Sequence, residues 1–225
     1  MTDAIETEFK LALPDAAAME RLLALVLRPG VRAPERCRQE NHFLDTADDA
    51  LRHARCVLRL RSEDGRWELA LKGPAHATAN AALQARAEEQ RPLDAALAEA
   101  ARKGTRSPVE LLAESRPESD LVRRARDLLG GRPLVERAGF VNERLRLEPG
   151  LLVAPWGEPW HLVLELDRTV FPGGRVDHEL EVELPDVKRA PEVLAALRGL
   201  FREADLAWTP ARSKAERLFQ SLDER

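Results

Sequence analysis

The sequence contains no tyrosine, only two cysteines, and only five lysines among its 35 basic residues. The missing tyrosine excludes any mechanism that depends on a tyrosine hydroxyl. The cysteines, Cys37 and Cys56, form no CxxC or Cys/His spacing, which argues against a zinc site and indicates inert thiols in a reducing compartment. Because arginine is the default cation, each lysine marks a candidate position for a compact ammonium where a planar guanidinium does not fit.

The sequence also lacks a long apolar run and an excess of positive charge. No stretch is apolar enough to span a bilayer, and the N-terminus shows no signal-peptide pattern. The formal net charge of −4 argues against broad binding to duplex nucleic acid. We therefore expect a soluble, cytoplasmic protein with residues 1–225 in one domain, and with neither duplex nucleic acid nor a membrane as a partner.

Charged and apolar residues alternate along several segments, which predicts β-strands with one charged and one apolar face. The first such segment, Ile5 to Leu11, places Glu6, Glu8 and Lys10 on its charged face. The later segments place on their charged faces Arg59, Arg61, Glu68, Lys72, Arg86, Glu88, Arg144, Arg146, Glu165, Asp167, Glu179, Glu181 and Glu183. The Gly73-Pro74 pair predicts the end of the strand that precedes it.

Two arrangements would bury the apolar faces of these strands. In a sandwich or an open sheet, the apolar faces meet and the charges lie in water. In a closed barrel, the charges line the lumen and amphipathic helices cover the outside. Helices that could supply this cover are predicted at 16–27, 47–54, 190–205 and 212–222, and in parts of 92–131.

The signs of the charges favour the barrel lumen. Glu179, Glu181 and Glu183 are like charges on one strand face, about 7 Å apart. Enclosed carboxylates at this spacing repel one another unless they are protonated or neutralised by a counter-ion. A hard divalent cation suits carboxylate oxygens, and arginine and lysine on the other strands suit phosphate oxygens. The combination indicates a polyphosphate bound as a metal complex.

The segment Glu6-Thr7-Glu8-Phe9-Lys10 resembles the ExExK signature of the CYTH superfamily, the triphosphate tunnel metalloenzymes. Further segments match this family in order along nearly the whole chain: Phe43 to Thr46, Leu58 to Arg61, Trp67 to Gly73, Arg86 to Glu88, Phe140 to Arg144, Leu166-Asp167, Glu179 to Glu183 and Ser213 to Ala215. The resemblance implies an α+β fold, an antiparallel eight-stranded β-barrel tunnel with a charged lumen and flanking helices.

The resemblance also implies a set of site residues. It assigns the binding of Mg²⁺ or Mn²⁺ to Glu6, Glu8, Asp167, Glu179, Glu181 and Glu183. It assigns the triphosphate clamp to Lys10, Arg59, Arg61, Lys72, Arg86, Arg144 and Lys214, which include three of the five lysines. We expect Glu6 and Glu8 to lie across the tunnel from Glu179 and Glu181, with metal and phosphate between them.

The chain departs from the family pattern near Asp45-Thr46, where members often carry tyrosine and this sequence has Phe43 and Leu44. Water activated by the metal ion then remains as the nucleophile, with Lys10 or a glutamate as the proton acceptor. Glu88 is expected to orient this water or an arginine of the clamp. Lys10 and Glu88 are therefore the predicted catalytic residues.

We therefore predict a metal-dependent enzyme that hydrolyses a triphosphate to diphosphate and orthophosphate. Inorganic tripolyphosphate is preferred, because no segment indicates a pocket for a base or a thiazole ring. The alternatives are a thiamine triphosphatase, a class IV-type adenylate cyclase that forms cyclic AMP and pyrophosphate, and a non-catalytic binder of polyphosphate or nucleotide. A small-molecule triphosphate is the expected partner, and a homodimer is left open as the oligomeric state.

Overall fold

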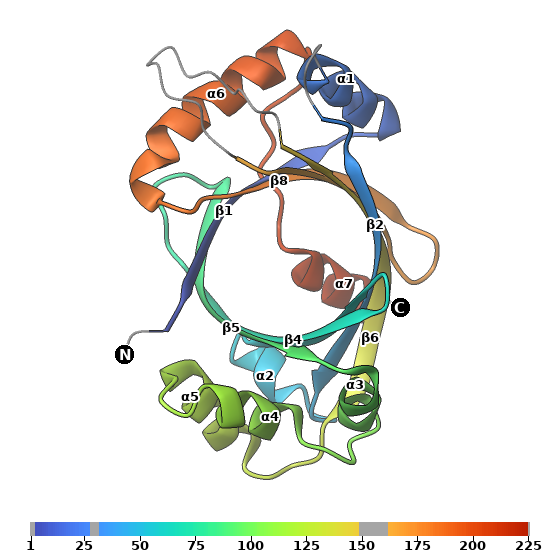
Figure 1. Cartoon of the computed structure of the whole chain (residues 1–225), viewed down its shortest axis with the longest axis vertical. Coiled ribbons are helices and arrows are strands. Elements are labelled where there is room, and N and C mark those ends of the chain that lie inside the picture. The colour runs from blue at the N-terminus through green and yellow to red at the C-terminus, as the bar shows by residue number, and fades with distance from the viewer. Residues whose placement is uncertain (1–2, 28–31, 149–161, 225) are drawn as a thin grey trace.

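Eight antiparallel strands close into a barrel in the computed structural model, which describes residues 3–27, 32–148 and 162–224 (Figure 1). The strands are β1 (Ile5–Leu13), β2 (Glu35–Asp45), β3 (Val57–Glu63), β4 (Arg66–His76), β5 (Leu83–Leu93), β6 (Val135–Leu147), β7 (Leu164–Val170) and β8 (Val176–Glu183). Around the barrel they follow the order β1-β5-β4-β3-β2-β6-β7-β8, and β8 pairs with β1. The predicted α+β fold with an eight-stranded antiparallel barrel is confirmed.

Helices cover the outward, apolar faces of the strands. They are α1 (Ala16–Val26), α2 (Ala50–His53), α3 (Ala95–Arg102), α4 (Pro108–Ser115), α5 (Asp120–Leu129) and α6 (Ala190–Glu203), with a 3₁₀ turn at Val187–Arg189; a further helix, α7 (Lys214–Asp223), is placed differently. One core cluster packs Leu22 of α1 and Leu197 of α6 against Leu180 of β8. A second cluster packs helices α2 to α5 against β3 and β4 on the opposite side of the barrel (Figure 1). This burial of the apolar strand faces leaves the charged faces to line the lumen.

Helix α7 differs from the others, because it projects within the ring of strands in the view of Figure 1 and packs on side chains that face the lumen. Its Leu218 and Phe219 pack against Phe43 of β2 and Phe140 of β6, whose side chains face the lumen. The Phe43 and Phe219 ring centroids lie 6.0 Å apart. A capping box between Ser213 and Glu216 fixes the start of the helix. The helix therefore fills part of the lumen with apolar side chains and holds its first residue, Lys214, at a fixed place.

The expected end of β4 at Gly73-Pro74 is wrong, since the strand runs on to His76. The register between β4 and β5 shifts between Lys72 and Ala75, so that Pro74 lies in an irregular stretch of the ladder. A Cβ atom at Gly73 would lie 3.2 Å from Leu121 of α5. Here glycine thus permits close packing of α5 on the strand.

No helix in the described part of the chain has the length and the apolar character that a membrane crossing requires. This finding agrees with the absence of long apolar runs in the sequence.

Gly139 allows β6 to approach β2 closely, and its replacement by alanine is expected to destabilise the barrel. A Cβ atom at this position would lie 2.6 Å from the backbone oxygen of Asn41, so one backbone must shift. We expect Gly139→Ala to lower the free energy of unfolding by about 1–3 kcal/mol in urea titrations. Gly199, in exposed turns of α6, has no atom within 4 Å of such a Cβ. Gly199→Ala should instead raise stability by up to about 1 kcal/mol, and equal effects of the two changes would refute this explanation.

Candidate functional site

A polar cavity of about 230 Å³ lies in the lumen of the barrel. Most of the predicted site residues line it: Glu6, Glu8, Lys10, Arg59, Arg61, Lys72, Arg86, Arg144, Glu181, Glu183 and Lys214. The other three stand directly behind this lining. Glu88 contacts Lys72 at 3.0 Å, and Asp167 and Glu179 contact Lys214. The fold therefore brings together residues that are more than 200 positions apart in the sequence.

Apart from Lys10 of β1 and Lys214 of α7, which lie beside the carboxylates, acidic and basic side chains occupy different walls of the cavity. Carboxylates come from the neighbouring strands β7, β8 and β1, which contribute Glu165, Glu181, Glu183, Glu6 and Glu8. Cations come from β5, β4 and β3, which contribute Arg86, Lys72, Arg59 and Arg61, and from β6, which contributes Arg144 and Arg146. We call these the acidic wall and the basic wall. Strand β2 lies between the two groups of basic strands and contributes neutral side chains.

Glu6 and Glu8 do not lie across the lumen from Glu179 and Glu181, so that expectation is wrong. The barrel closes through the pairing of β1 with β8, which makes these two strands neighbours. In this register Lys10 pairs with Glu181. The two predicted carboxylate sets therefore form one continuous acidic wall rather than two facing sets.

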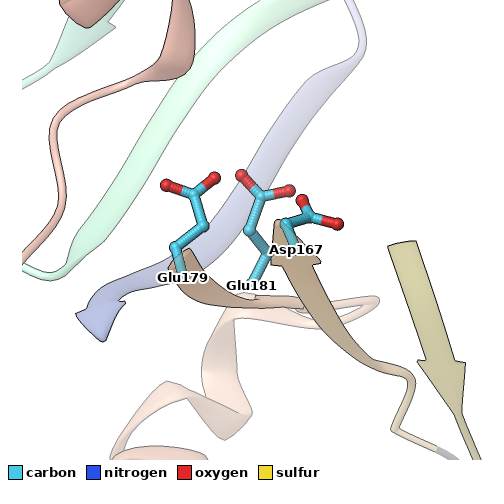
Figure 2. Close-up of side chains that lie close together, drawn as sticks. All are labelled: Asp167, Glu179 and Glu181. Atoms are coloured by element: carbon cyan, nitrogen blue, oxygen red, sulfur yellow. The ribbon is translucent and has the colours of Figure 1, made fainter. Parts of the chain in front are cut away.

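Glu181 of the acidic wall forms a compact cluster with two carboxylates behind the lining, and we call Asp167, Glu179 and Glu181 the acidic triad (Figure 2). One carboxylate oxygen from each residue lies within 4.8 Å of the corresponding oxygens of the other two. Asp167 of β7 and Glu179 of β8 are cross-strand partners, and Glu181 follows on the same face of β8. All three side chains are buried. Close, buried carboxylate oxygens are the ligand type that Mg²⁺ and Mn²⁺ prefer, so the triad fits such an ion.

Two cations neutralise the acidic triad in the ligand-free protein. The Lys214 Nζ atom lies 2.7 Å from an Asp167 oxygen and 3.0 Å from a Glu181 oxygen, and it also contacts Glu179. Arg144 donates two hydrogen bonds to Asp167, at 2.7 and 2.6 Å, and one to Glu181 at 2.6 Å. Burial opposes the charge of Arg144, but attraction to Asp167 outweighs it and raises the pKa of the guanidinium. These contacts hold the three carboxylates together despite their mutual repulsion.

Among the other carboxylates of the acidic wall, Glu183 has the least compensated charge. Burial raises the pKa of Glu183, and the nearby carboxylates Glu6 and Glu8 raise it further. The Oε1 atom of Glu8 is buried without a hydrogen-bond partner. Lys72 contacts Glu6 at 2.7 Å and Lys10 contacts Glu8 at 3.0 Å, so the charges of these two carboxylates are balanced at least in part. The charge of Glu183 indicates room for an additional cation.

The basic wall shows the complementary imbalance. Burial lowers the pKa of Arg59, and the adjacent Arg61 lowers it further. The Nε atoms of Arg59 and Arg86 are buried without a hydrogen-bond partner. Glu68 compensates only in part, since it lies 2.7 Å from Arg61 but 3.9 Å from Arg59. A ligand with anionic oxygens would satisfy these donors, and a metal ion beside it would balance the acidic wall.

The two predicted catalytic residues are both charged in this arrangement. Burial opposes the charge of Lys10, but attraction to Glu181 and Glu8 outweighs it and raises the pKa of the ammonium. Lys10 therefore holds its proton near neutral pH, which favours a role as a cation over one as a proton acceptor. Burial is likewise outweighed at Glu88, whose pKa is lowered mainly by Lys72. Glu88 contacts Lys72 of the basic wall at 3.0 Å, and its expected role in orienting water or an arginine stays a prediction.

Several residues of the site were not among the predicted site residues. Arg146 and Glu165 belong to the charged alternation, yet no family motif includes them; they line the cavity and pair with each other at 3.2 Å. Arg217 lies one turn after Lys214 on α7 and contacts Glu179, so helical spacing could have revealed it. Gln39 and Asn41 line the cavity from β2, but a search for charged faces passes over neutral side chains.

Solved structures from Hippeastrum, Bacillus halodurans and Pyrococcus horikoshii share this architecture. HpAC1 from Hippeastrum, a proposed adenylyl cyclase with a dominant triphosphatase activity, is 26% identical, with a TM-score of 0.72 over 96% of this chain and 95% of its own. A proposed adenylate cyclase from Bacillus halodurans is 20% identical, with a TM-score of 0.67 over 97% of this chain and 100% of its own. PH1819 from Pyrococcus horikoshii is 17% identical, with a TM-score of 0.54 over 98% and 99% of the two chains. The last two likenesses concern the fold alone.

By sequence, no curated protein matches the chain. The family model described as the CYTH domain matches residues 4–217, which include every strand of the barrel and both carboxylate sets of the acidic wall. Fold, charged lumen and family model agree, and the chain belongs to the CYTH domain family.

Proposed function

We propose that this protein is a Mg²⁺- or Mn²⁺-dependent hydrolase that converts inorganic tripolyphosphate into diphosphate and orthophosphate. The observation that carries the proposal is the meeting of an acidic and a basic wall around one cavity, with the charges of Glu183 on one side and Arg59 on the other incompletely compensated. A metal–triphosphate complex supplies the missing cation and the missing anion together. Membership of the CYTH family and the triphosphatase activity given for HpAC1 support the same reaction class.

In this proposal the acidic triad holds the metal ion, which supplies positive charge that polarises the phosphate oxygens. Arg59, Arg61, Lys72 and Arg86 bind the phosphate oxygens from the basic wall. Water attacks the terminal phosphorus, the bond to the bridging oxygen breaks, and diphosphate and orthophosphate leave. A carboxylate of the acidic wall accepts the proton of the water, while the Lys10 ammonium neutralises the charge that develops on the phosphates.

Adenylate cyclase activity is the second candidate, because HpAC1 is a proposed adenylyl cyclase that is 26% identical to this chain. The same walls would bind the triphosphate of ATP, and attack by the ribose 3′-hydroxyl would release pyrophosphate. A substrate panel separates the candidates: tripolyphosphate, thiamine triphosphate and ATP, each with Mg²⁺ or Mn²⁺, scored for orthophosphate, pyrophosphate and cyclic AMP. We expect orthophosphate from tripolyphosphate at the highest rate. Cyclic AMP from ATP would favour the cyclase. Tight binding of a triphosphate without turnover would instead indicate a non-catalytic binder of polyphosphate or nucleotide.

The Lys214 ammonium contacts all three carboxylates of the acidic triad, so a metal ion bound by these oxygens replaces it. We therefore expect Lys214→Gln to bind Mn²⁺ at least about tenfold more tightly than the wild type without substrate, because no ammonium competes. Electron paramagnetic resonance of free Mn²⁺ measures this directly. Lys103→Gln removes the same charge from an exposed side chain and should leave the affinity unchanged. Equal Mn²⁺ affinity of Lys214→Gln and wild type would show that the ion binds elsewhere.

A further inference from the structure

Buried polar atoms without partners gather at the cavity. In the described ranges, six buried side-chain nitrogen or oxygen atoms have no hydrogen-bond partner. Four of them belong to residues that line the cavity: Glu8, Asn41, Arg59 and Arg86. The three charged residues belong to the acidic and basic walls already described. Asn41, a neutral residue, has no role in the mechanism so far.

Asn41 lies on β2, in the gap between the two parts of the basic wall. Its neighbour in register on β3 is Arg61, and its neighbour on β6 is Phe140. Only 2% of its surface is exposed, and the unpaired atom is the amide nitrogen Nδ2. The backbone at this point is held firmly, because Gly139 lets β6 pack against the Asn41 carbonyl. The side chain is therefore a fixed hydrogen-bond donor at the wall of the cavity.

Other buried amides nearby show that the fold can satisfy such groups. Gln39, two residues earlier on the same face, donates to Glu63 at 2.6 Å. Asn142 donates to Gln39 at 3.0 Å and accepts a hydrogen bond from Thr169 at 2.8 Å. A buried donor without a partner costs stability, so the exception at Asn41 calls for a partner that binds in the cavity.

We propose that Asn41 is a substrate-binding residue whose amide donates a hydrogen bond to a phosphate oxygen of the bound triphosphate. This inference rests on the proposed function, since it names a further contact for the same substrate. A neutral donor is suited to this place, because another cation beside Arg61 would add to the repulsion that already lowers the pKa of Arg59. Asn41 therefore adds direction to the binding of the anion without adding charge.

The test is Asn41→Leu, which keeps the size of the side chain and removes the donor. The ligand is an imido analogue of tripolyphosphate, whose P–N–P bridges resist hydrolysis, bound in the presence of Mg²⁺ and measured by calorimetry. We expect the dissociation constant to rise about tenfold to a hundredfold. We also expect the melting temperature of the ligand-free protein to stay the same or to rise, because an unsatisfied buried donor is removed.

Asn142→Leu is the matched control, since Asn142 is a buried amide with partners and does not line the cavity. It should lower the melting temperature of the ligand-free protein. A lower melting temperature for Asn41→Leu with unchanged binding of the analogue would make Asn41 a structural residue and overturn the inference alone. A wild-type protein that does not bind the analogue at all would overturn the proposed function and the inference with it.

Discussion

Glu181→Gln is expected to lower the metal-dependent hydrolysis of tripolyphosphate at least about a hundredfold. Glu181 is the member of the acidic triad that also lines the cavity, and it contacts Lys10, Arg144 and Lys214. An amide of the same size provides one neutral oxygen in place of a carboxylate, so the triad loses a third of its negative charge. The affinity for the metal ion should therefore fall, and Lys10 should be held less firmly beside the phosphates. Initial rates of orthophosphate release at saturating Mg²⁺ and tripolyphosphate measure the effect.

A suitable control for this change is Glu143→Gln, on the outer face of β6. Glu143 pairs with Arg168 at 3.1 Å, and 58% of its side chain is exposed. This variant removes one carboxylate from the barrel without touching the cavity, so its rate should equal that of the wild type. Melting temperatures of both variants show whether the fold is intact. Full activity of a folded Glu181→Gln protein would refute the assignment of the acidic triad to the metal.

Arg144→Leu is expected to cause the largest loss of stability, about 3–5 kcal/mol. The guanidinium makes short hydrogen bonds to Asp167 and Glu181 and also contacts Glu165. Asp167 has no exposed surface, so its carboxylate cannot recover these interactions from water. The melting temperature should therefore fall by roughly 6–20 °C, as followed by circular dichroism.

Two further variants separate this explanation from a loss of packing. Arg123→Leu removes an arginine whose partner, Asp120, has 71% of its side chain exposed, and it should cause no measurable change. Adding Asp167→Leu to Arg144→Leu removes a buried carboxylate that has lost its two hydrogen bonds to the guanidinium, so it should restore part of the lost stability. If the double variant is less stable than the single one, the cost does not come from this under-compensated carboxylate.

Much of the fold and of the candidate site could be predicted from the alternation of charge along the strands. Residues two apart share a face, and runs such as Glu179, Glu181 and Glu183 cannot easily face an apolar core, so the lumen position followed from local geometry. The family resemblance supplied the order of the segments. Most of the predicted site residues line the cavity, and the roles assigned to them stay predictions.

The errors and omissions have specific physical causes. The relation of Glu8 to Glu181 depends on which strands meet when the barrel closes, and alternation within a strand carries no information about its neighbours. Asn41 was missed because its significance lies in the absence of a hydrogen-bond partner, which only the packed structure reveals. The position of α7 depends on its packing against lumen-facing Phe43 and Phe140, and a search for charged strand faces passes over these apolar side chains.

The pairing of β1 with β8 also has a consequence for how the chain folds. Lys10 and Glu181, which face each other across this pair, are 171 residues apart in the sequence. During synthesis, β1 must wait for most of the chain to emerge before its second edge is covered, and an uncovered strand edge invites pairing with other chains. Contacts between such distant residues also slow folding, because the intervening loop must close first. The step that joins the two parts of the acidic wall is therefore also the step that covers this strand edge and removes it as a site of aggregation.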